Sequence, residues 1–538
     1  MEKSYKADVV IAGAGLAGIV TACELLERGR KVLLIDKDNR ERLGGLARES
    51  FGGVHFIGTP HQKRLGIDDS PELAYRDWQR YACFAENDHW PRAWAKFYCE
   101  HSLEYIFHFL QGKKIRFLPL VNWTERGLFG PGNSVPRWHI AWGTGAEIVK
   151  NLITALETHP KRQNLELLFE HEVNGIETAG GRVAGVLGRE LSSGKEFRAA
   201  GEVVIASGGI CGGDLSKVRA NWFREWGTPP QILLNGAHRY GDGLLHDKVA
   251  ALGGNLTHLD KQWHYAAGVH HPARRKAHDG LSLLPPRSAL WMNAMGQRIG
   301  PLPLISHADT RWLVESIVHQ PGGYSWQVLN WKIAARELAV SGSDYMTAFT
   351  TKSKPLLLKH LLLGNNELVE RLLQECPEDF VAADSLPELV QKMNERSLFD
   401  LRVDLPTMER DISEYDAMID RGPAFFNDEQ LRRIGNHRSY WGDRVRTCKF
   451  RKILDVRARP LIAIREFILS RKSLGGIQTD LQCRVINRHG MPIDGLYAVG
   501  EAAGFGGGGI HGLRSLEGTF LGSCVLTGRI AGKVIAGA

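Results

Sequence analysis

Three glycines near the N-terminus have the spacing of a phosphate-binding turn. Gly13, Gly15 and Gly18 form a Gly-x-Gly-x-x-Gly pattern between an apolar run at 8–12 and a helical pattern at 19–28. The first glycine allows a tight turn, the second lets the backbone approach a pyrophosphate, and the third lets the helix pack on the strand. Amide groups at the start of the helix stabilise the phosphate charge. The pattern therefore predicts that this turn binds a dinucleotide.

An acidic residue follows where a ribose-binding carboxylate is needed. Gly29 stands where the helix would end, residues 31–35 form a second apolar strand pattern, and Asp36 comes directly after them. A carboxylate at this strand end accepts hydrogen bonds from a ribose hydroxyl. Strand, turn, helix and acid together predict a βαβ unit, which is far more specific than a lone glycine turn. This motif alone does not separate NAD from FAD.

A second glycine-dense block near the C-terminus selects between these two cofactors. Residues 500–504 read Gly-Glu-Ala-Ala-Gly, and four consecutive glycines follow at 506–509. Glycine at this density is typical of backbone that approaches a ligand closely. A further glycine-containing loop at 44–53 can bring backbone N–H groups to a flavin ring. The two ends of the chain are therefore expected to complete one FAD site.

The remaining patterns place these motifs in an α/β fold. Apolar strands are expected near 165–173 and 203–207, whereas the charged helical patterns at 366–375 and 386–395 lie in a glycine-poor centre. The nucleotide-binding pattern is expected to resume near 459–464. We therefore expect a Rossmann-like FAD-binding domain in two parts, with an α+β cap (substrate) domain inserted between them. The expected bounds are 1–280 and 441–538 for the FAD-binding domain and 281–440 for the cap.

Composition and charge exclude several classes of function. The net charge of +8 is not gathered into basic runs with interleaved aromatics, so no nucleic-acid partner is expected. The eight cysteines form no metal or haem motif and fit the reduced thiols of a cytoplasm. No stretch is long and apolar enough to span a bilayer. The leucine-rich segment at 356–363 is expected to be a helix that packs on a neighbour.

These motifs together resemble the FAD-dependent fumarate reductase/succinate dehydrogenase flavoprotein superfamily, in particular its branch of FAD-binding dehydrogenases related to 3-ketosteroid dehydrogenases. The matching segments run from Gly13 to the C-terminus and include 134–139, 241–243, 474–477 and the block from Gly500. The resemblance implies that the substrate lies between a mobile cap and the flavin. It also implies insertion or removal of a carbon–carbon double bond beside an electron-withdrawing group. One hydrogen then moves as a hydride to or from flavin N5, and the other moves as a proton through a side chain.

The resemblance and the motifs define the expected cofactor contacts. Glu501 is expected near the ribityl chain and pyrophosphate, Val173 near the adenine, and 516–519 at the pyrimidine end, where a helix N-terminus stabilises negative charge. His55 does not match the superfamily's covalent-FAD histidine, so non-covalent FAD is expected. The expected cofactor-binding residues are Gly13, Gly15, Leu16, Ala17, Gly18, Asp36, Lys37, Gly44, Gly45, Ser50, Gly52, Gly53, Val173, Ser207, Gly208, Gly209, Asp242, Gly500, Glu501, Ser515, Leu516, Gly518 and Thr519.

The catalytic candidates occupy positions where this chain departs from its relatives. Fumarate reductases of this group carry histidines where this chain has Arg471 and Lys472, and an arginine where it has Ser515. Steroid Δ1-dehydrogenases carry Tyr-Pro-Gly where this chain has Gly-Gly-Ile at 508–510. A cationic pair near a substrate carbonyl can stabilise enolate charge. The candidates are His511, Arg514, Arg471, Lys472, Tyr265 and Tyr440. Surface ion pairing is the alternative role for the cations, and packing is the alternative role for the tyrosines.

The sequence thus predicts an FAD-dependent oxidoreductase acting on a CH–CH bond adjacent to a carbonyl or carboxylate. Its expected partner is a small molecule, either an apolar cyclic ketone or an unsaturated acid, with an electron acceptor or donor that the sequence does not identify. A flavin oxidase or hydroxylase that uses oxygen is one alternative. A flavoprotein electron-transfer subunit is another, although no iron–sulfur cysteine motif is present. The sequence leaves a homo-oligomer open.

Overall fold

The N-terminal glycine pattern folds into a strand, a tight turn and a helix. In the computed structural model, which describes residues 3–537, β1 (Lys3–Ala12) leads through the turn into α1 (Leu16–Glu27) and then β2 (Val32–Ile35). The strands β1 and β2 pair in parallel from Val9 opposite Val32 to Ala12 opposite Ile35. The predicted βαβ unit is therefore present.

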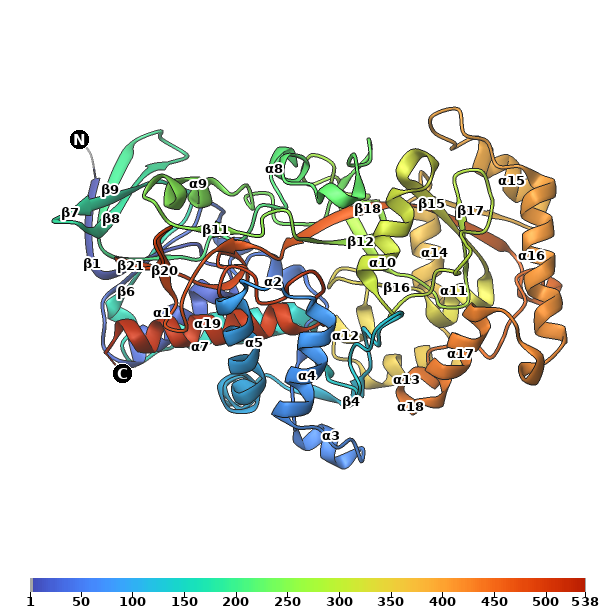
Figure 1. Cartoon of the computed structure of the whole chain (residues 1–538), viewed down its shortest axis with the longest axis horizontal. Helices are drawn as coiled ribbons and strands as arrows, with labels where there is room; N and C mark the ends of the chain where they lie inside the picture. The colour runs from blue at the N-terminus through green and yellow to red at the C-terminus, as the bar shows by residue number, and fades with distance from the viewer. Residues whose placement is uncertain (1–2, 538) are drawn as a thin grey trace. The chain divides into compact units, whose positions relative to one another are not determined.

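The chain divides into two units, which are described separately (Figure 1). Unit 1 comprises the described residues of 3–223, 237–263 and 471–537, and unit 2 comprises 224–236 and 264–470. Residues 264–280 and 441–470, expected from the sequence in the FAD-binding domain, lie in unit 2. The reason is that β12 (Gln262–His270) and β18 (Leu461–Ser473) are long strands that leave unit 1 and pair within the sheet of unit 2.

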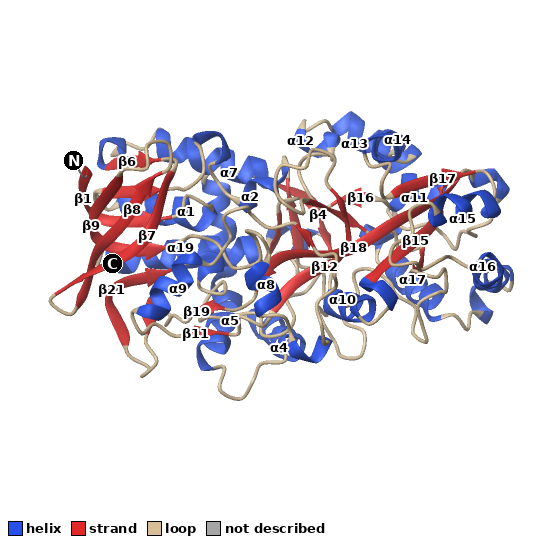
Figure 2. Ribbon diagram, turned by 90° about the horizontal axis from the view of Figure 1, so that it is seen from above, coloured by secondary structure: helices blue, strands red, loops and turns tan. Residues whose placement is uncertain are grey.

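The main sheet of unit 1 carries parallel strands in the order β21, β9, β1, β2 and β6, with antiparallel strands added at β20, β7 and β8 (Figure 2). Its apolar side chains, such as Val10, Leu33 and Val203, are buried in one core. The carboxyl ends of the parallel strands meet at one edge, which is where ligands bind in such sheets. The bounds not given above are β6 Leu165–Leu168, β7 His171–Ala179, β8 Arg182–Glu190, β9 Glu196–Ile205, β20 Arg484–Ile486 and β21 Pro492–Ala498.

Helices and two small sheets surround this sheet. The C-terminal helix α19 (Thr519–Ile535) packs on α1, so the end of the chain returns to the N-terminal turn. The small strands are β3 Gly53–His55, β4 Phe117–Asn122, β5 Trp138–Ala141, β11 Leu256–Thr257 and β19 Gly476–Ile477. The other α-helices of unit 1 are α2 Leu46–Glu49, α3 Pro60–Arg64, α4 Pro71–Ala82, α5 His89–His101, α6 Phe109–Gly112, α7 Thr144–Glu157, α8 Ser216–Ala220 and α9 Leu244–Ala251.

Unit 2 is built on an eight-stranded sheet whose main order is β14, β15, β18, β12, β13 and β16, with β10 and β17 paired to β18. The strand bounds are β10 Leu234–Asn235, β13 Gly280–Leu284, β14 Leu290–Asn293, β15 Tyr324–Asn330, β16 Ala339–Val340 and β17 Phe380–Ala383. The α-helices are α10 Thr310–Val318, α11 Trp331–Glu337, α12 Thr347–Thr350, α13 Lys354–Leu363, α14 Asn366–Glu375, α15 Leu386–Asn394, α16 Leu405–Asp420, α17 Glu429–Ser439 and α18 Trp441–Arg444. Both units mix helices with strands, as the α/β prediction requires.

Two local predictions of helices in unit 2 are confirmed. The charged pattern at 366–375 forms α14, which buries Leu368, Val369 and Leu372 as an amphipathic helix should. The leucine-rich segment forms α13, which contacts α11 and α12 as predicted, although none of its residues is fully buried. Among residues 3–537, no helix has both the length and the apolar character that crossing a bilayer requires.

Candidate functional site

The three glycines of the first turn serve different physical needs. A Cβ at Gly13 would lie 2.3 Å from the Ala206 carbonyl oxygen, and one at Gly18 would lie 2.0 Å from the Gly13 carbonyl oxygen. Both glycines are therefore required by the fold. At Gly15 the backbone conformation is ordinary, with φ of −73°, and no atom lies within 4 Å of the Cβ position. Nothing in the protein requires glycine there, so the requirement points to a ligand.

The start of α1 also fits an anionic ligand. Gly15 is the N-cap residue of α1, and no side chain caps the amides of the first turn, which includes Leu16, Ala17 and Gly18. Uncapped amides and the helix dipole attract phosphate. The Cβ of Ala17 would lie 2.8 Å from a Cβ built on Gly500. The two glycine blocks, which are separated by almost the whole chain, are therefore in contact, as predicted.

The ends of β2 and β7 bring together the residues expected at the adenosine end. Asp36 Oδ2 accepts a 2.6 Å hydrogen bond from the Ala14 amide, and the Asp36 carbonyl accepts one of 3.0 Å from His171. Lys37 Nζ lies 2.6 Å from Glu172 and 3.2 Å from Asp242. Val173, the neighbour of Glu172, is buried. The positions predicted to bind ribose and adenine are thus clustered in unit 1.

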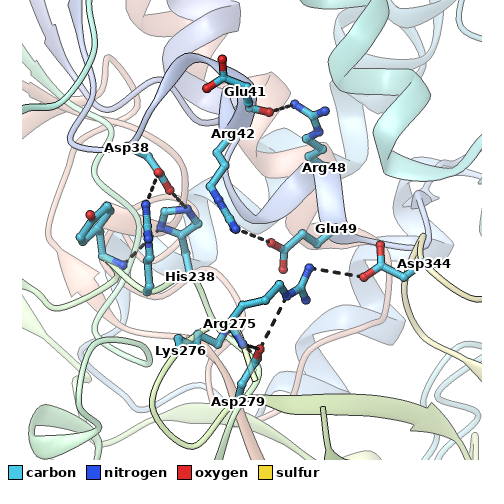
Figure 3. Close-up of polar contacts among 12 residues, drawn as sticks. Asp38, Glu41, Arg42, Arg48, Glu49, His238, Arg275, Lys276, Asp279 and Asp344 are labelled. Carbon is cyan, nitrogen blue, oxygen red and sulfur yellow. Dashed lines mark hydrogen bonds and ion pairs between the residues drawn. The ribbon is translucent and has the colours of Figure 1, made fainter. Parts of the chain in front are cut away.

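Asp38, which the sequence patterns did not single out, is a buried carboxylate in the same cluster. It lies 3.2 Å from His238 Nε2 and accepts a hydrogen bond from Arg239 (Figure 3). Burial acts to raise its pKa, but the His238 and Arg239 contacts outweigh burial and hold the pKa well below its usual range. Because its partners are some 200 residues away in sequence, no local pattern could have revealed it.

The second glycine loop is held by packing within unit 1. Arg42 lies 4.0 Å from Glu49 across the loop that contains Gly44 and Gly45, and both glycines have positive φ (Figure 3). The Ser50 hydroxyl donates to the Ala47 carbonyl at 2.7 Å. The Gly44 amide also donates to the Ala14 carbonyl at 3.0 Å, and the Gly45 amide donates to the Arg42 carbonyl at 3.3 Å, so the predicted contact of this loop with the flavin stays a prediction.

The pair at the end of the same loop is required by its neighbours. A Cβ at Gly52 would lie 2.5 Å from the Thr144 backbone, and one at Gly53 would lie 1.9 Å from Trp138 Nε1. Packing against neighbouring residues therefore explains why positions 52 and 53 are glycine. The predicted contact of these residues with the cofactor would be made by their backbone groups.

Glu501 joins two of the predicted cofactor segments. It accepts a 2.9 Å hydrogen bond from the Ser473 amide, and Ser473 Oγ accepts one of 2.7 Å from Ile210. A Cβ at Gly209 would lie 2.5 Å from the Glu501 carboxylate. Burial raises the pKa of Glu501 to about 7, although the Ser473 amide opposes the shift. The Ser207-Gly208-Gly209 turn at the end of β9 is therefore in contact with the C-terminal block.

The start of α19 presents a second uncapped helix N-terminus. Gly518 is its N-cap, with φ of +95°, and no side chain caps the first turn. The Ser515 hydroxyl lies 3.0 Å from the Thr519 hydroxyl, which donates to the Leu516 carbonyl at 2.6 Å. These internal bonds leave the helix dipole available to an anionic group.

Lys472 is the catalytic candidate whose pKa is brought close to neutral pH. Its Nζ lies 3.9 Å from the ring centroid of Phe520. Burial lowers its pKa to about 8, while Glu517 opposes this shift and Arg471 adds to it. Glu517 is itself fixed by a 2.8 Å hydrogen bond from Trp263 Nε1. A lysine with this pKa is partly neutral near physiological pH and can exchange a proton.

The cationic pair of Arg471 and Lys472 that the sequence suggests stays a prediction. Arg471 and Lys472 are consecutive residues of β18, and successive side chains of a strand point to opposite faces. The two side chains therefore leave the strand in opposite directions, although the charges of both act to lower the pKa of Glu501. The positive charge of Arg471 also contributes to the lowered pKa of Lys472.

His511 is enclosed by aromatic side chains. Its ring stacks on Trp78 with centroids 5.8 Å apart and contacts Phe505 and Phe520 at 5.3 and 4.8 Å. Burial and then Lys472 keep its pKa well below the usual range, so the ring is neutral. Neither ring nitrogen has a hydrogen-bond partner among residues 3–537. This enclosure is typical of packing and ranks His511 after Lys472 as a proton-exchanging group.

The three other candidates come from both units. Arg514 Nη1 is 3.7 Å from Cys83 Sγ at a partly exposed position of unit 1. Tyr265, on β12, and Tyr440, at the N-cap of α18, both belong to unit 2 and are partly buried. Their predicted roles remain predictions.

Unit 2 contains a buried polar cluster of its own. Glu466 on β18 is opposite Ser325 on β15, and Gln327 lies two residues further along β15 on the same face. All three are fully buried, and none of their polar side-chain atoms has a hydrogen-bond partner within residues 3–537. Burial, with a smaller effect from Asp379, raises the pKa of Glu466 well above its usual range. The protonated form of the carboxyl is therefore favoured in the folded protein.

The raised pKa predicts a pH-dependent stability. A glutamate in the unfolded chain has a pKa of about 4.3. Above this pH, the folded chain keeps a proton on Glu466 that the unfolded chain has released. Folding stability then falls as the pH rises. The variant Glu466→Gln has no proton to lose. Its unfolding temperature should match that of the wild type near pH 4.5 and exceed it by several degrees at pH 8, as measured by differential scanning fluorimetry.

An exposed glutamate of α14 provides the control for this prediction. The substitution Glu370→Gln, at an exposed position of α14, should leave the pH dependence unchanged. Parallel curves for Glu466→Gln and the wild type would show that Glu466 is ionised in the folded protein.

Comparison with known proteins identifies the family. Residues 8–521 match the family described as FAD binding domain. The chain is 40% identical over 548 aligned residues to a KsdD-like steroid dehydrogenase of Mycobacterium tuberculosis, covering 98% of this chain and 95% of that protein. The fold is similar to the open conformation of a flavocytochrome c3 fumarate reductase, with a TM-score of 0.69, 19% identity and coverage of 99% of this chain and 78% of that one.

A second solved structure shares the fold over nearly its whole length. The 3-ketosteroid-Δ4-(5α)-dehydrogenase from Rhodococcus jostii RHA1 has a TM-score of 0.66 and 19% identity, with coverage of 100% of this chain and 98% of that one. The family resemblance predicted from the sequence is confirmed. The family match and the two uncapped helix N-termini agree on FAD as the cofactor. The chain therefore belongs to the FAD binding domain family and is an FAD-dependent oxidoreductase.

Proposed function

We propose that this protein is a dehydrogenase that introduces a carbon–carbon double bond next to the carbonyl of an apolar cyclic ketone of the steroid type. The observation that carries the proposal is the 40% identity, over nearly the full length of both chains, with a KsdD-like steroid dehydrogenase. A fumarate-type dicarboxylate is the less favoured substrate, because the sequence identity with a fumarate reductase of Shewanella frigidimarina is lower, at 25% over 537 residues.

The residues that would hold FAD follow from the cradle in unit 1. Gly15 and the first turn of α1 would face the pyrophosphate, and the carboxylates of Asp36 and Glu501 would accept hydrogen bonds from hydroxyl groups of the cofactor. The first turn of α19 would face the pyrimidine end of the flavin, where its dipole stabilises negative charge. The Rossmann-like two-part organisation belongs to this proposal, with unit 2 as the cap that contributes to substrate binding.

The chemistry of the proposed reaction divides between cofactor and protein. Bound FAD supplies a hydride acceptor. Lys472 in its neutral form would take the proton from the carbon next to the substrate carbonyl, and the electrons of that C–H bond would form the new double bond as a hydride leaves the adjacent carbon. The charge of Arg471 supports this role because it lowers the pKa of Lys472 towards the working pH.

Apolar surroundings favour an apolar substrate. Phe520 and Trp263, which contact Lys472 and Glu517, would exclude water from the reacting groups. Water exclusion strengthens the electrostatic effect of nearby charges on a developing enolate. Tyr265 and Tyr440 of unit 2 are the proposed contributions of the cap.

Anaerobic mixing of the FAD-loaded protein with a substrate panel tests this function. We expect a 3-ketosteroid to bleach the flavin absorbance within seconds to minutes, with one double bond gained by the steroid as measured by mass spectrometry. Succinate and a steroid lacking the ketone should leave the flavin oxidised. Bleaching by succinate alone would contradict the proposal, and bleaching by none of the panel members would exclude the dehydrogenation direction for these compounds.

A further inference from the structure

Helix α13 in unit 2 is rich in leucine yet contributes no buried residue. Six of its ten residues are leucine, in the sequence Lys-Pro-Leu-Leu-Leu-Lys-His-Leu-Leu-Leu. The neighbouring helix α14 buries Leu368, Val369 and Leu372 in the core of unit 2. Packing within the described chain therefore explains the apolar residues of α14 but not those of α13.

The outer face of α13 combines exposed leucines with lysines. The exposed fractions of Leu358, Leu362 and Leu363 are 57%, 69% and 70%. Lys354 and Lys359 are exposed, and each lies four residues before an exposed leucine, Leu358 and Leu363 respectively, so each lysine shares a side of the helix with a leucine. The opposite face, which includes Leu357 and Leu361, is partly buried. An apolar surface of this kind usually marks a site of interaction.

The acidic residues nearest in sequence lie outside α13, at Asp344 before it and at Glu367 of α14 after it. Residues 345–366 contain Lys352, Lys354 and Lys359 and no aspartate or glutamate. The long lysine side chains can bury their methylene groups in an apolar layer while their ammonium groups reach the polar boundary. Exposed leucines beside lysines fit a helix whose side chains reach into the boundary of an anionic bilayer.

The helix is formed and held before any partner binds. The Ser353 hydroxyl caps its N-terminus by accepting a 3.3 Å hydrogen bond from the Leu356 amide. Arg336 Nη1 donates to the Leu361 carbonyl at 2.5 Å, near the C-terminal end. The Asn365 amide donates to the Ala335 carbonyl at 2.7 Å and ties the following turn to α11. The exposed leucines are thus displayed on an ordered element.

We propose that the outer face of α13 docks on the surface of a bilayer that contains anionic phospholipid. The leucines enter the acyl boundary, and the three lysines pair with lipid phosphates. A second copy of this chain fits the face less well, because a symmetric contact would bring the lysines of one copy against those of the other. The proposal does not rest on the proposed substrate, although a bilayer is where apolar ketones accumulate.

Vesicle sedimentation of the FAD-loaded protein tests the proposal, with flavin absorbance as the measure of bound protein. We expect binding to vesicles of phosphatidylcholine with about one third phosphatidylglycerol. Binding should weaken in 0.5 M salt to a level close to that on phosphatidylcholine alone, since salt screens the lysine charges. The double variant Leu362→Ser/Leu363→Ser should need at least about tenfold more lipid for half binding. The double variant Lys354→Gln/Lys359→Gln should lose the preference for anionic vesicles.

Controls separate docking from folding and from self-association. Met491→Ser, which removes an exposed apolar side chain of unit 1, should bind vesicles like the wild type. All variants should keep their FAD and their unfolding temperature. Absence of wild-type binding to the anionic vesicles overturns the proposal, as does unchanged binding by the leucine variant. A wild-type dimer in light scattering that becomes a monomer in the leucine variant would assign the face to a second copy and also overturn it. Substrate bleaching is measured separately, so failure of either proposal is distinguishable from failure of the other.

Discussion

The variant Lys472→Met should reduce bound flavin about 10²–10⁴-fold more slowly than the wild type in anaerobic stopped-flow mixing with a 3-ketosteroid. This loss of rate is the size expected when one positioned proton-exchanging group is removed. Methionine keeps the length and apolar stem that pack on Phe520 but carries no proton. The amount of FAD bound per mole of protein should be unchanged, because Lys472 is proposed to exchange a proton with the substrate and not to bind the phosphates of the cofactor.

The pH dependence of the rate distinguishes proton exchange from packing. Because the pKa of Lys472 is about 8, the reactive neutral form grows roughly tenfold per pH unit below that value. The rate of flavin reduction should therefore rise with pH and level off near pH 8. The variant Lys472→Arg retains positive charge but stays protonated, so it should be slow at every pH.

A lysine elsewhere on unit 1 provides the matched control. Lys96→Met changes an exposed lysine of α5 and should leave both the rate and the pH profile unaltered. If Lys472→Met kept the wild-type profile, the proton would pass through another residue, and the tyrosines of unit 2 would become the first candidates.

The variant Gly15→Val should fold normally and purify without flavin. No protein atom lies within 4 Å of the Cβ position, and the residue has ordinary φ, so the fold itself can accept the side chain. The added side chain would instead fill the approach to the amides at the start of α1, where the pyrophosphate is expected. Flavin absorbance per mole of protein should fall at least about twentyfold, and added FAD should not restore it.

Two further glycine variants show whether the loss of FAD is specific to position 15. Gly112→Val, also at a position with no atom within 4 Å but outside the cradle, should retain FAD. Gly13→Val should destabilise the protein itself, because its Cβ would overlap the Ala206 carbonyl and its φ is +114°. Unfolding of the flavin-free wild type and of Gly15→Val should coincide. Normal FAD content in Gly15→Val would contradict the assignment of the N-terminal turn.

The sequence could predict the residues of the dinucleotide-binding turn, but it could not predict residues whose partners come from distant parts of the chain. The turn from Gly13 to Gly18 and the acid at Asp36 are local in sequence, since a strand, a helix and a cap follow from nearby residue types. Asp38 could not be found in this way because its partners, His238 and Arg239, arrive from another part of unit 1. The low rank of His511 likewise depends on Trp78 and Phe520, which no spacing relates to it.

By itself, the sequence determined the cofactor class, the α/β character and the family, because glycine spacing and strand and helix periodicity are local properties of the chain. Only the tertiary structure decided which charged residues act together. It set Arg471 and Lys472 on opposite faces of one strand and gave Lys472 a pKa of about 8 through burial beside Phe520 and Glu517. It also left the leucines of α13 exposed. Burial and long-range contacts set desolvation and electrostatic energies, and these depend on which distant segments meet.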